Sequence, residues 1–557
     1  MRMPSVRIGR VDRGPFGATV VGGSVVLVGM YGHTPLWSCV SLATVALIVV
    51  GVRVAGRTPL RWTTDWLEFR FGRAARARLL TGRATLTDIR VAAGVCGIRT
   101  DGTTLVAMIQ VAPDLDLPTV IAEQTVYTED TVPVELLVPL LDQFGIAVEI
   151  DIVTTGQRVR STGSYSLLYD QLIGSHPVVG NRLTWLVVRL DQERNLPALA
   201  QRGPSAVVAP KALATAAFRI AGRLREQGII AHALPASAVG EASRLLHSGV
   251  ELSDLTERWT CLTTSTPGRC VTSFRIDWTR LEGIDLDDCW SWNRGQTTVM
   301  VSLSGSGEHP RGLVRFVGPA VEDPLPDYLR PLSGMQSAGL MASLPTGTPI
   351  PALAGMAPSA DGAPAGLLSE LRIAIGPSGQ ILGSISGQPR HTLALPLFDP
   401  APYNPRRRTI DIHAELPVAQ QIVLRATVVG AEVEVHTARP DRWRQLVAAV
   451  GDARSLRLIS DGVSTGQSGA GAATIAVFDK MPAGASTAQT TMTIAEPGAP
   501  RRAQADLAID QVAASVVDVR IPMRTVRVDL IEPRGETRYV AAPVPPVPLA
   551  ADAGRTG

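Results

Sequence analysis

The apolar positions near the start of the chain form one long uninterrupted stretch. Residues 14–52 contain no Asp, Glu, Lys or Arg, and turn residues at 31–35 divide this run into two halves. A helix that crosses a bilayer needs roughly 20 apolar residues, with about 17 as the lower limit. The pattern therefore predicts a transmembrane hairpin, with helices at 14–32 and 34–53.

Arginines on both sides of this stretch predict its orientation. Four precede it within residues 1–13 and seven follow it between residues 53 and 78, whereas the turn has no Lys or Arg. Because Arg-rich flanks stay on the cytoplasmic side, the pattern predicts a multi-pass protein of the inner (plasma) membrane with both termini cytoplasmic. A cleaved signal peptide, which has a single apolar core of about 7–15 residues, and a buried soluble hairpin are the less favoured interpretations.

Residues 54–90 are predicted to form a basic juxtamembrane segment. The first 90 residues hold thirteen Arg and four acidic residues, a net charge of +9, so the rest of the chain carries −6 of the total of +3. Trp62 and Trp66 alternate with arginines, which is typical of a helix at a membrane surface, where each Arg near anionic lipid gains about 1 kcal/mol. A connector packed on its own domain fits the same pattern, and both interpretations stay open.

Beyond residue 90 the pattern is that of a mixed α/β protein, and residues 91–320 are predicted to form a cytoplasmic domain. Apolar strands at 91–98 and 105–111 flank Asp101-Gly102, a strong hairpin signal. The other expected elements are a helix at 134–144, strands at 147–153, 183–190 and 229–234, and an amphipathic helix at 211–227. The strand–helix–strand order of the last three indicates a partly parallel sheet.

A stretch rich in proline and glycine, residues 321–368, predicts a linker to a second cytoplasmic α+β unit at 369–542. Its expected elements are strands at 371–375, 380–385, 391–397, 432–436, 456–459, 474–478, 492–495 and 525–531, and helices at 418–429 and 441–450. The Gly/Ser/Ala-rich loop 462–473 is expected to be mobile, and the Pro-rich tail 543–557 to be disordered.

Composition excludes several classes of protein. The 557 residues are 45% hydrophobic and 18% charged, which excludes wholesale disorder. Five scattered cysteines are too few for a disulfide scaffold. The only lysines, Lys211 and Lys480, do not follow a phosphate-binding Gly-rich loop, so the chain has no Walker A motif for ATP. The glycines between Gly376 and Gly383 approach a dinucleotide-binding spacing but precede a strand, so a β-turn is the better interpretation.

Two pairs of carboxylates have the spacing used to hold a divalent ion in metal-dependent glycosyl transfer, Asp114/Asp116 and Asp285/Asp287 with Asp288. Such pairs are common by chance, and a solvated loop or a helix cap is the more frequent outcome. The three cysteines Cys261, Cys270 and Cys289 lack CxxC spacing and are better explained as core thiols than as zinc ligands. The sequence therefore predicts no catalytic, cofactor-binding or metal-binding residue.

The order of these parts resembles the EccE family, membrane components of the type VII (ESX) secretion system of mycobacteria and related actinobacteria. The resemblance is carried by the two-span anchor and by residues 97–102, 184–192, Arg202-Gly203, the helix from Lys211, 228–229, Trp259, 287–290, 379–383 with 393–397, and 439–443. The count of 51 Arg against two Lys suits a GC-rich actinobacterial genome.

The resemblance implies a structural role. EccE-like proteins join EccB, EccC and EccD in a hexameric inner-membrane assembly in which EccC is the ATPase, and their cytoplasmic domain is similar to a glycosyltransferase fold. The leading hypothesis is a non-enzymatic, stabilising subunit of this complex, in contact with anionic lipid and with no nucleic acid. The alternative is a membrane-anchored, glycosyltransferase-like enzyme that uses a sugar nucleotide. A regulatory binding module is a third possibility.

Overall fold

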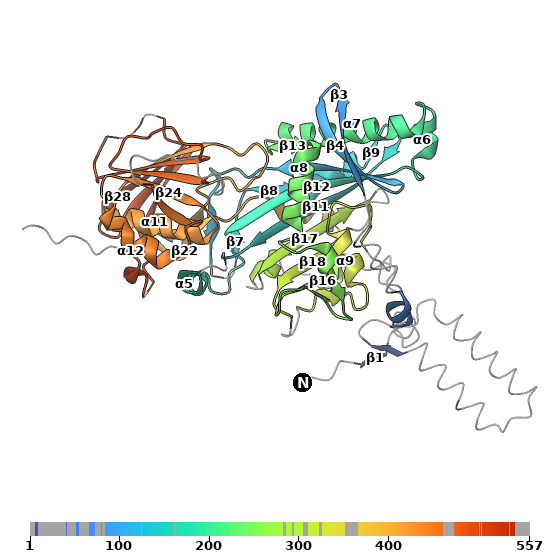
Figure 1. Cartoon of the computed structure of the whole chain (residues 1–557), viewed down its shortest axis with the longest axis horizontal. Helices are drawn as coiled ribbons and strands as arrows, with labels where there is room; N and C mark the ends of the chain where they lie inside the picture. Colours follow the sequence, from blue (N-terminus) through green and yellow to red (C-terminus); the bar gives the residue numbers. More distant parts are fainter. Residues whose placement is uncertain are drawn as a thin grey trace, which may run out of the picture.

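The computed structural model describes most of the chain. The described residues are 84–540, without 124, 161–162, 282–285, 292–294, 305–309, 322–325, 351–365, 460–472, 501, 503 and 534, and before these only 6–8, 41, 52–54, 66–72 and 80. They form two large β-sheets with helices packed on them, and the two bodies lie next to each other in Figure 1.

The first sheet is built from the earlier part of the chain. Its strand order is β14-β15-β16-β18-β17-β11-β12-β5-β4-β3, and all pairings among its described strands are antiparallel. The strands are β3 (Thr85–Val91), β4 (Gly94–Asp101), β5 (Thr104–Val111), β11 (Glu149–Gln157), β12 (Asn181–Asp191), β14 (Thr256–Glu257), β15 (Leu262–Thr263), β16 (Cys270–Ile276), β17 (Gln296–Leu303) and β18 (Arg311–Gly318), with β13 (Ala231–Ala233) beside β5 and β19 (Leu329–Pro331) beside β16.

Helices cover both faces of this sheet, which explains why its central strands are buried on both faces and mostly apolar. In β5, Leu105 and Ala107 pack with helix α7 (Ser205–Glu226), whereas Val106 packs with α8 (Ala236–Leu246) and α9 (Gln336–Ala342). Side chains alternate between the two faces of a strand, so a strand that serves both cores is buried at consecutive positions. The polar residue among them, Gln110, donates a hydrogen bond to the Tyr403 carbonyl. Consecutive residues of β5 are accordingly buried from Leu105 to Val111.

The expected strand–helix–strand element is present, but the partly parallel sheet predicted for this region is wrong. Strand β12, helix α7 and strand β13 follow one another, and both strands pair with β5 in antiparallel orientation. β5 therefore lies between two strands that run in the same direction, which makes every neighbouring pair antiparallel. The hairpin at Gly102 is confirmed, since Asp101 pairs with Thr104 and Gly102 has a φ of 60°.

The second sheet contains the parallel strands. Its order is β25-β24-β26-β27-β23-β28-β29-β30-β21-β22-β6-β7. The first six strands in this order, from β25 through β24, β26, β27 and β23 to β28, are paired in parallel, and the remaining pairs are antiparallel. The strands are β6 (Thr119–Ile121), β7 (Val126–Tyr127), β21 (Gln380–Ile385), β22 (Gln388–Leu395), β23 (Arg408–His413), β24 (Val433–Thr437), β25 (Leu456–Ile459), β26 (Ile475–Asp479), β27 (Thr490–Ala495), β28 (Leu507–Ala513), β29 (Val516–Ile521) and β30 (Arg524–Leu530).

One helix forms the centre of this second core. Helix α11 (Leu416–Val428) is buried along nearly its whole length, because α12 (Asp441–Val450), α5 (Ser164–Ile173) and the C-terminal turn η5 (Glu536–Arg538) surround it. Both α5 and the β6–β7 pair come from the part of the chain that precedes residue 180. The two bodies are therefore joined by several crossings of the chain.

The expected fold class needs a correction. The described chain is mixed α and β with large antiparallel sheets, and no helix in it is both long enough and apolar enough to cross a membrane. The transmembrane hairpin expected at 14–32 and 34–53 is therefore not supported, and apart from Ser41 and the three residues of β2 these segments lie outside the described residues. At the end of the second expected span, β2 (Val52–Val54) is a strand paired with β1 (Val6–Ile8).

The helix expected at 134–144 is a 3-10 helix, η1 (Val134–Leu140), followed by a short hairpin of β9 (Asp142–Gln143) and β10 (Ile146–Ala147). Pro139 lies inside the expected helix and removes a backbone donor, which limits the helical run. Other short elements are β8 (Thr131–Pro133) paired with β20 (Arg372–Ala374), α6 (Leu196–Ala200), α10 (Leu367–Glu370), η2 (Leu252–Asp254), η3 (Trp278–Arg280) and η4 (Leu286–Ser291).

Within the stretch expected to be a linker, Tyr328, Leu332 and α9 pack into the cores of the first sheet. The expected loop 462–473, except Ala473, and the tail 543–557 lie outside the described residues. The domain boundaries themselves stay a prediction.

Candidate functional site

The first carboxylate pair singled out in the sequence is held by two arginines. Asp114 and Asp116 follow β5, and Arg406 and Arg408 lie just before or at the start of β23. Arg406 Nη2 lies 2.7 Å from Asp116 Oδ2 and Arg406 Nη1 lies 3.5 Å from Asp114 Oδ1, while Arg408 Nη2 lies 3.0 Å from Asp116 Oδ1. Arg408 is fully buried and also donates to the carbonyls of Leu115 and Pro396.

This cluster joins the two sheets and does not resemble a metal site. A divalent ion would have to displace two guanidinium groups that already neutralise the carboxylates. Burial lowers the pKa of Arg408 to about 10, so it remains charged at neutral pH. Sequence reasoning missed both arginines, because they lie about 290 positions away along the chain.

The second carboxylate pair is also engaged. Asp287 Oδ1 accepts a hydrogen bond of 3.0 Å from the Trp290 indole, and Asp287 Oδ2 lies 3.9 Å from Arg182. Asp288 accepts a weak hydrogen bond from Tyr328 Oη. Asp285 lies outside the described residues. Among the described residues no group of three or more His, Cys, Asp or Glu side chains could hold a metal ion.

The glycines between Gly376 and Gly383 serve the packing of the sheet. A Cβ on Gly379 would lie 2.1 Å from the Leu395 carbonyl carbon, and one on Gly383 would lie 2.2 Å from the Asp529 carbonyl oxygen. The spacing that suggested a dinucleotide loop therefore reflects the close approach of β21 to β22 and β30.

Three of the four described cysteines, Cys96, Cys270 and Cys289, are buried, and the fourth, Cys261, is partly buried. Burial raises the pKa of the Cys96 thiol to about 12, which keeps it protonated and unreactive. Cys270 is buried and lies beside Cys261, and Cys289 lies in the same apolar cluster of the first sheet as Cys96. The arrangement agrees with the interpretation as thiols in a reduced protein.

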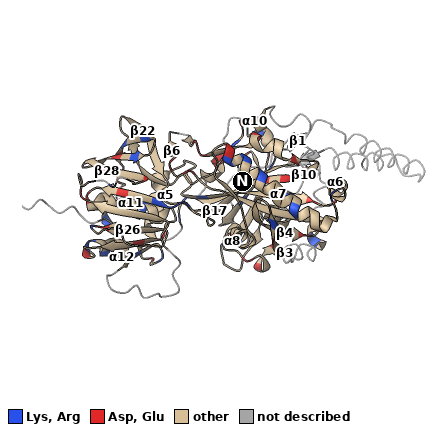
Figure 2. Ribbon diagram, turned by 90° about the horizontal axis from the view of Figure 1, so that it is seen from above, with Lys and Arg blue, Asp and Glu red and all other residues tan. Residues whose placement is uncertain are grey.

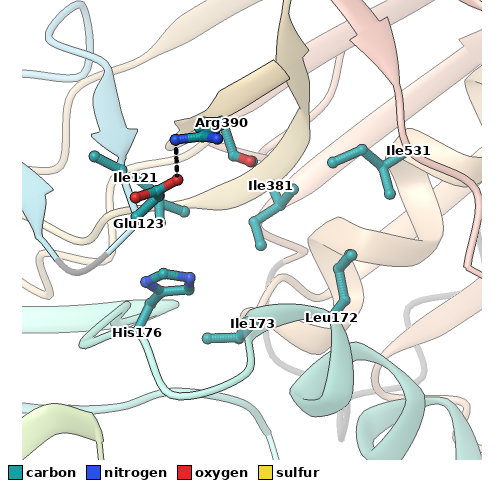
Figure 3. A pocket seen from close by; sticks show the side chains of 10 residues that line it. Ile121, Glu123, Leu172, Ile173, His176, Ile381, Arg390 and Ile531 are labelled. Atoms are coloured by element: carbon teal, nitrogen blue, oxygen red, sulfur yellow. Dashed lines mark ion pairs between the residues drawn. The ribbon is translucent and has the colours of Figure 1, made fainter. Parts of the chain in front are cut away.

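The pocket in Figure 3 lies where the early segment of the chain joins the second sheet. Its volume is about 330 Å³, and its floor is aliphatic. β6, α5 and β21 contribute Ile121, Ile173 and Ile381, all buried, and the partly buried Leu172 and Ile531 complete this surface. Such a floor favours an apolar side chain.

The rim of this pocket is charged. Arg390 forms an ion pair of 2.8 Å with Glu123, and the His176 ring lies on the other side of the pocket in Figure 3. Burial and the neighbouring Arg158 lower the pKa of His176, so this imidazole is neutral at pH 7. The pocket can bind an apolar group, but the described residues around it include no nucleophile with an adjacent base.

A second, larger pocket of about 550 Å³ lies between α8 and the ends of β11, β12 and β17. Amide and hydroxyl groups of Thr155, Gln157, Asn181 and Gln296 line it, with Glu241 and Arg244 on the helix side. The lining is therefore polar, with one acidic and one basic side chain on the helix side.

Asp130 is the described carboxylate with the most unusual environment. Burial, aided by the nearby Asp114, raises the pKa of Asp130 to about 7, although the N–H groups of Asp114 and Gly376 donate to it. The folded chain therefore holds a proton between about pH 4 and pH 7 that the unfolded chain releases. The contribution of Asp130 to stability is consequently lost as the pH rises through this range.

Replacing Asp130 by asparagine is expected to flatten this pH dependence. The variant should gain about 1–2 kcal/mol over the wild type between pH 5 and pH 8, because an amide keeps an acceptor oxygen and carries no charge. Urea unfolding at both pH values measures the difference. Asp327→Asn is the matched control, since Asp327 is fully exposed to solvent on the surface. Equal pH profiles for wild type and D130N would contradict the assignment.

Charges are dispersed over the described chain. In the view of Figure 2, Lys and Arg are interspersed with Asp and Glu over the described parts of both bodies. Nucleic-acid interfaces gather positive charge on one face, so this distribution does not favour a polyanion as the ligand. The described residues thus form two pockets, and the carboxylates Asp114, Asp116 and Asp287 are engaged by other side chains.

Comparison with known proteins identifies several similar proteins. A family model described as "Putative type VII ESX secretion system translocon, EccE" matches residues 178–276, which include β12, α7 and α8. The chain is 27% identical over 432 residues to the ESX-2 secretion system protein EccE2 of Mycobacterium tuberculosis, covering 76% of this chain and 70% of that relative.

Other relatives match shorter parts. The ESX-1 secretion system protein EccE1 of Mycobacterium tuberculosis is 32% identical over 199 residues, which cover 35% of this chain and 42% of that relative. The ESX-5 secretion system protein EccE5 of Mycobacterium marinum is 28% identical over 238 residues, covering 38% of this chain and 55% of the relative. The matches to these two relatives therefore span about half of their length.

Proposed function

We infer from these similarities that the chain belongs to the EccE family and is a component of a type VII (ESX) secretion system. We propose from this premise that it is a structural subunit that stabilises the secretion complex without chemistry of its own. The observation that carries the proposal is the similarity to EccE2 over 76% of the chain. The pairing of Asp114, Asp116 and Asp287 with other side chains supports the non-enzymatic part, because the glycosyltransferase alternative depended on these residues.

The partners we propose are the EccB, EccC and EccD subunits of a hexameric complex at the plasma membrane. An ATPase elsewhere in the complex, EccC, fits a chain whose two lysines do not form a phosphate-binding loop. In this scheme the present chain contributes surfaces and rigidity, and the energy for export comes from its neighbour.

Anionic lipid is a further proposed partner, supported by residues 66–71. These residues are helical, and the Phe69 ring packs against Trp259 with a centroid distance of 5.3 Å. Trp66, Leu67 and Phe71 nevertheless remain exposed, by 53%, 45% and 76%. Both sequence interpretations are thus represented: one side chain docks on the domain, and three are free for a membrane surface beside the arginines of this segment.

The proposal is tested by purifying the membrane complex from cells that lack this chain. We expect the yield of intact complex and the export of its substrates to fall at least tenfold, because a stabilising subunit is missing, and to recover when the full chain is restored. The complex is quantified by native gel electrophoresis after mild detergent extraction.

An intact complex with undiminished export would refute the structural role. In the same preparations, a variant with serine at Trp66, Leu67 and Phe71 is expected to retain less anionic phospholipid than the wild type. Equal lipid content would refute the lipid contact and leave the structural role standing.

A further inference from the structure

The turn of the β9–β10 hairpin contains a residue that its backbone conformation disfavours. Gln143 pairs with Ile146, so the turn consists of Phe144 and Gly145, with φ values of 58° and 75°. A two-residue hairpin turn with positive φ at both positions prefers Asn-Gly or Asp-Gly. A left-handed conformation costs an aromatic residue roughly 1–2 kcal/mol, and the sequence keeps phenylalanine there.

Phe144 gains little burial in return for this strain. Its side chain is 75% exposed, whereas Gln143 and Ile146 on either side of the turn are buried. Apart from the Arg219 guanidinium over its ring, the described part of the folded chain gives no packing reason for an aromatic residue at this position. Departures from a local rule without a compensating gain in stability are expected at functional positions.

The surrounding groups hold Phe144 in place. Arg202 donates a hydrogen bond to its carbonyl oxygen, and the Arg219 guanidinium lies 4.4 Å from the ring centroid. Arg219 also donates to Gln143 Oε1 at 3.3 Å, and the Gly145 N–H donates to Asp142 Oδ1 at 3.1 Å. An exposed aromatic ring that is fixed in this way loses little conformational entropy when it binds a partner.

The turn is part of a larger surface at one end of the first sheet, where β9, α6 and α7 lie together in Figure 1. Asn195 exchanges two hydrogen bonds with the Ala147 backbone, of 2.7 and 2.8 Å, and so joins the start of α6 to the hairpin. The next residue, Leu196, is also exposed. Among the ion pairs of the described residues none includes Arg202 or Arg219, and the carboxylate of Asp142 on the same hairpin accepts from the Gly145 N–H, so two arginines without a carboxylate partner flank the exposed Phe144 ring.

We propose that Phe144 is the anchor of a protein–protein interface, and that its partner is another subunit of the secretion complex with an apolar pocket bordered by Asp or Glu side chains. The inference rests on the proposed function for the identity of the partner. An aromatic side chain surrounded by arginines has the composition of an interface hot spot. Two guanidinium groups without a carboxylate partner favour negative charge on the opposite surface.

The decisive variant is Phe144→Asn, which places the preferred residue in the turn. We expect the denaturant midpoint of the full chain to stay constant or rise, because the strain is relieved. We expect the amount of EccB-, EccC- and EccD-type subunits that co-purify with the chain to fall at least tenfold, because the anchor is lost. Arg202→Glu should weaken the same association, and the wild-type association should weaken with increasing salt.

Met523→Asn is the matched control. Met523 is another exposed apolar residue at a hairpin turn, between β29 and β30, and its replacement should leave the complex unchanged. Unchanged co-purification for F144N would overturn the inference, and so would a lowered denaturant midpoint, which would make Phe144 a structural residue. If F144N left the complex intact but abolished self-association of the chain or its binding to anionic vesicles, the partner of Phe144 would be a second copy of the chain or a membrane. Either result would overturn the assigned partner. The proposed function would stand in each case, because it fails only if deletion of the whole chain leaves the complex intact.

Discussion

Replacing Arg425 by methionine is expected to lower the free energy of unfolding by about 3–5 kcal/mol, because it leaves Glu536 as an unpaired buried charge. Arg425 lies on the buried helix α11, and Glu536 lies in η5 near the end of the described chain. Arg425 Nε and Nη2 donate to the two carboxylate oxygens of Glu536 at 3.1 and 2.9 Å, and both side chains are almost fully buried.

The pair also holds together three distant segments. Arg425 Nη1 donates to the carbonyls of Ile381 and Leu382 at 3.0 and 3.1 Å, and Tyr165 of α5 donates to Glu536. Methionine can fill part of the volume but makes none of these hydrogen bonds. The C-terminal turn should therefore detach from α5 and α11 before the rest of the sheet unfolds, which hydrogen exchange would detect as lost protection in residues 535–540.

Arg223→Met is the matched control, since Arg223 pairs with Glu226 on the exposed face of α7, and its loss should cost less than about 0.5 kcal/mol. The double variant Arg425→Met/Glu536→Met should recover part of the loss, because both buried charges are removed. Denaturant unfolding of the full chain in mild detergent measures all four proteins. A change below about 1 kcal/mol for R425M would show that the pair is not integral to this core.

The hydrophobic pattern was sufficient for most individual strands and helices. Strands expected at 147–153, 183–190 and 380–385 correspond to β11, β12 and β21, and the helix expected at 211–227 corresponds to α7. These elements are long or strongly periodic, and their signal is local. The apolar pattern at 134–144 predicted an α-helix, but the structure has the 3-10 helix η1, because Pro139 interrupts the backbone hydrogen bonds.

Pairing between elements could not be derived in the same way. The strand–helix–strand order of β12, α7 and β13 suggested parallel neighbours, but β5 inserts between the two strands. The choice of the strand that inserts depends on contacts between residues far apart in the sequence, so a local pattern cannot predict it. The same limit explains why α5 could not be assigned to the second core.

The candidate sites illustrate this limit most clearly. Asp114 and Asp116 were recognisable as a pair of carboxylates, but their function as partners of Arg406 and Arg408 depends on the fold. Phe144 falls within the helix expected at 134–144, and only the turn conformation makes it unusual. A Phe-Gly pair between two short apolar runs was the available signal, and it is weak because Asn-Gly is the usual form.

The largest effect of a single added carbon is expected at Gly379. Gly379→Ala should lower the free energy of unfolding by at least about 3 kcal/mol, because the new methyl group meets backbone and cannot be relieved by a side-chain rotation. A Cβ at this position would lie 2.1 Å from the Leu395 carbonyl carbon and 2.2 Å from Pro396 N, and φ is +78°. Because Gln380 pairs with Leu395, the clash would push β21 away from β22 at the start of their pairing.

Gly387→Ala separates the two causes of this loss. Gly387 lies in the turn of the same β21–β22 hairpin with a φ of +80°, but no atom lies within 4 Å of the position of its Cβ. Its substitution should cost only the backbone strain, roughly 1–2 kcal/mol. Denaturant unfolding of both variants gives the contribution of the clash as their difference. Equal losses would mean that β21 and β22 can separate freely, and the glycines from Gly376 to Gly383 would then need an explanation other than the close packing of the sheet.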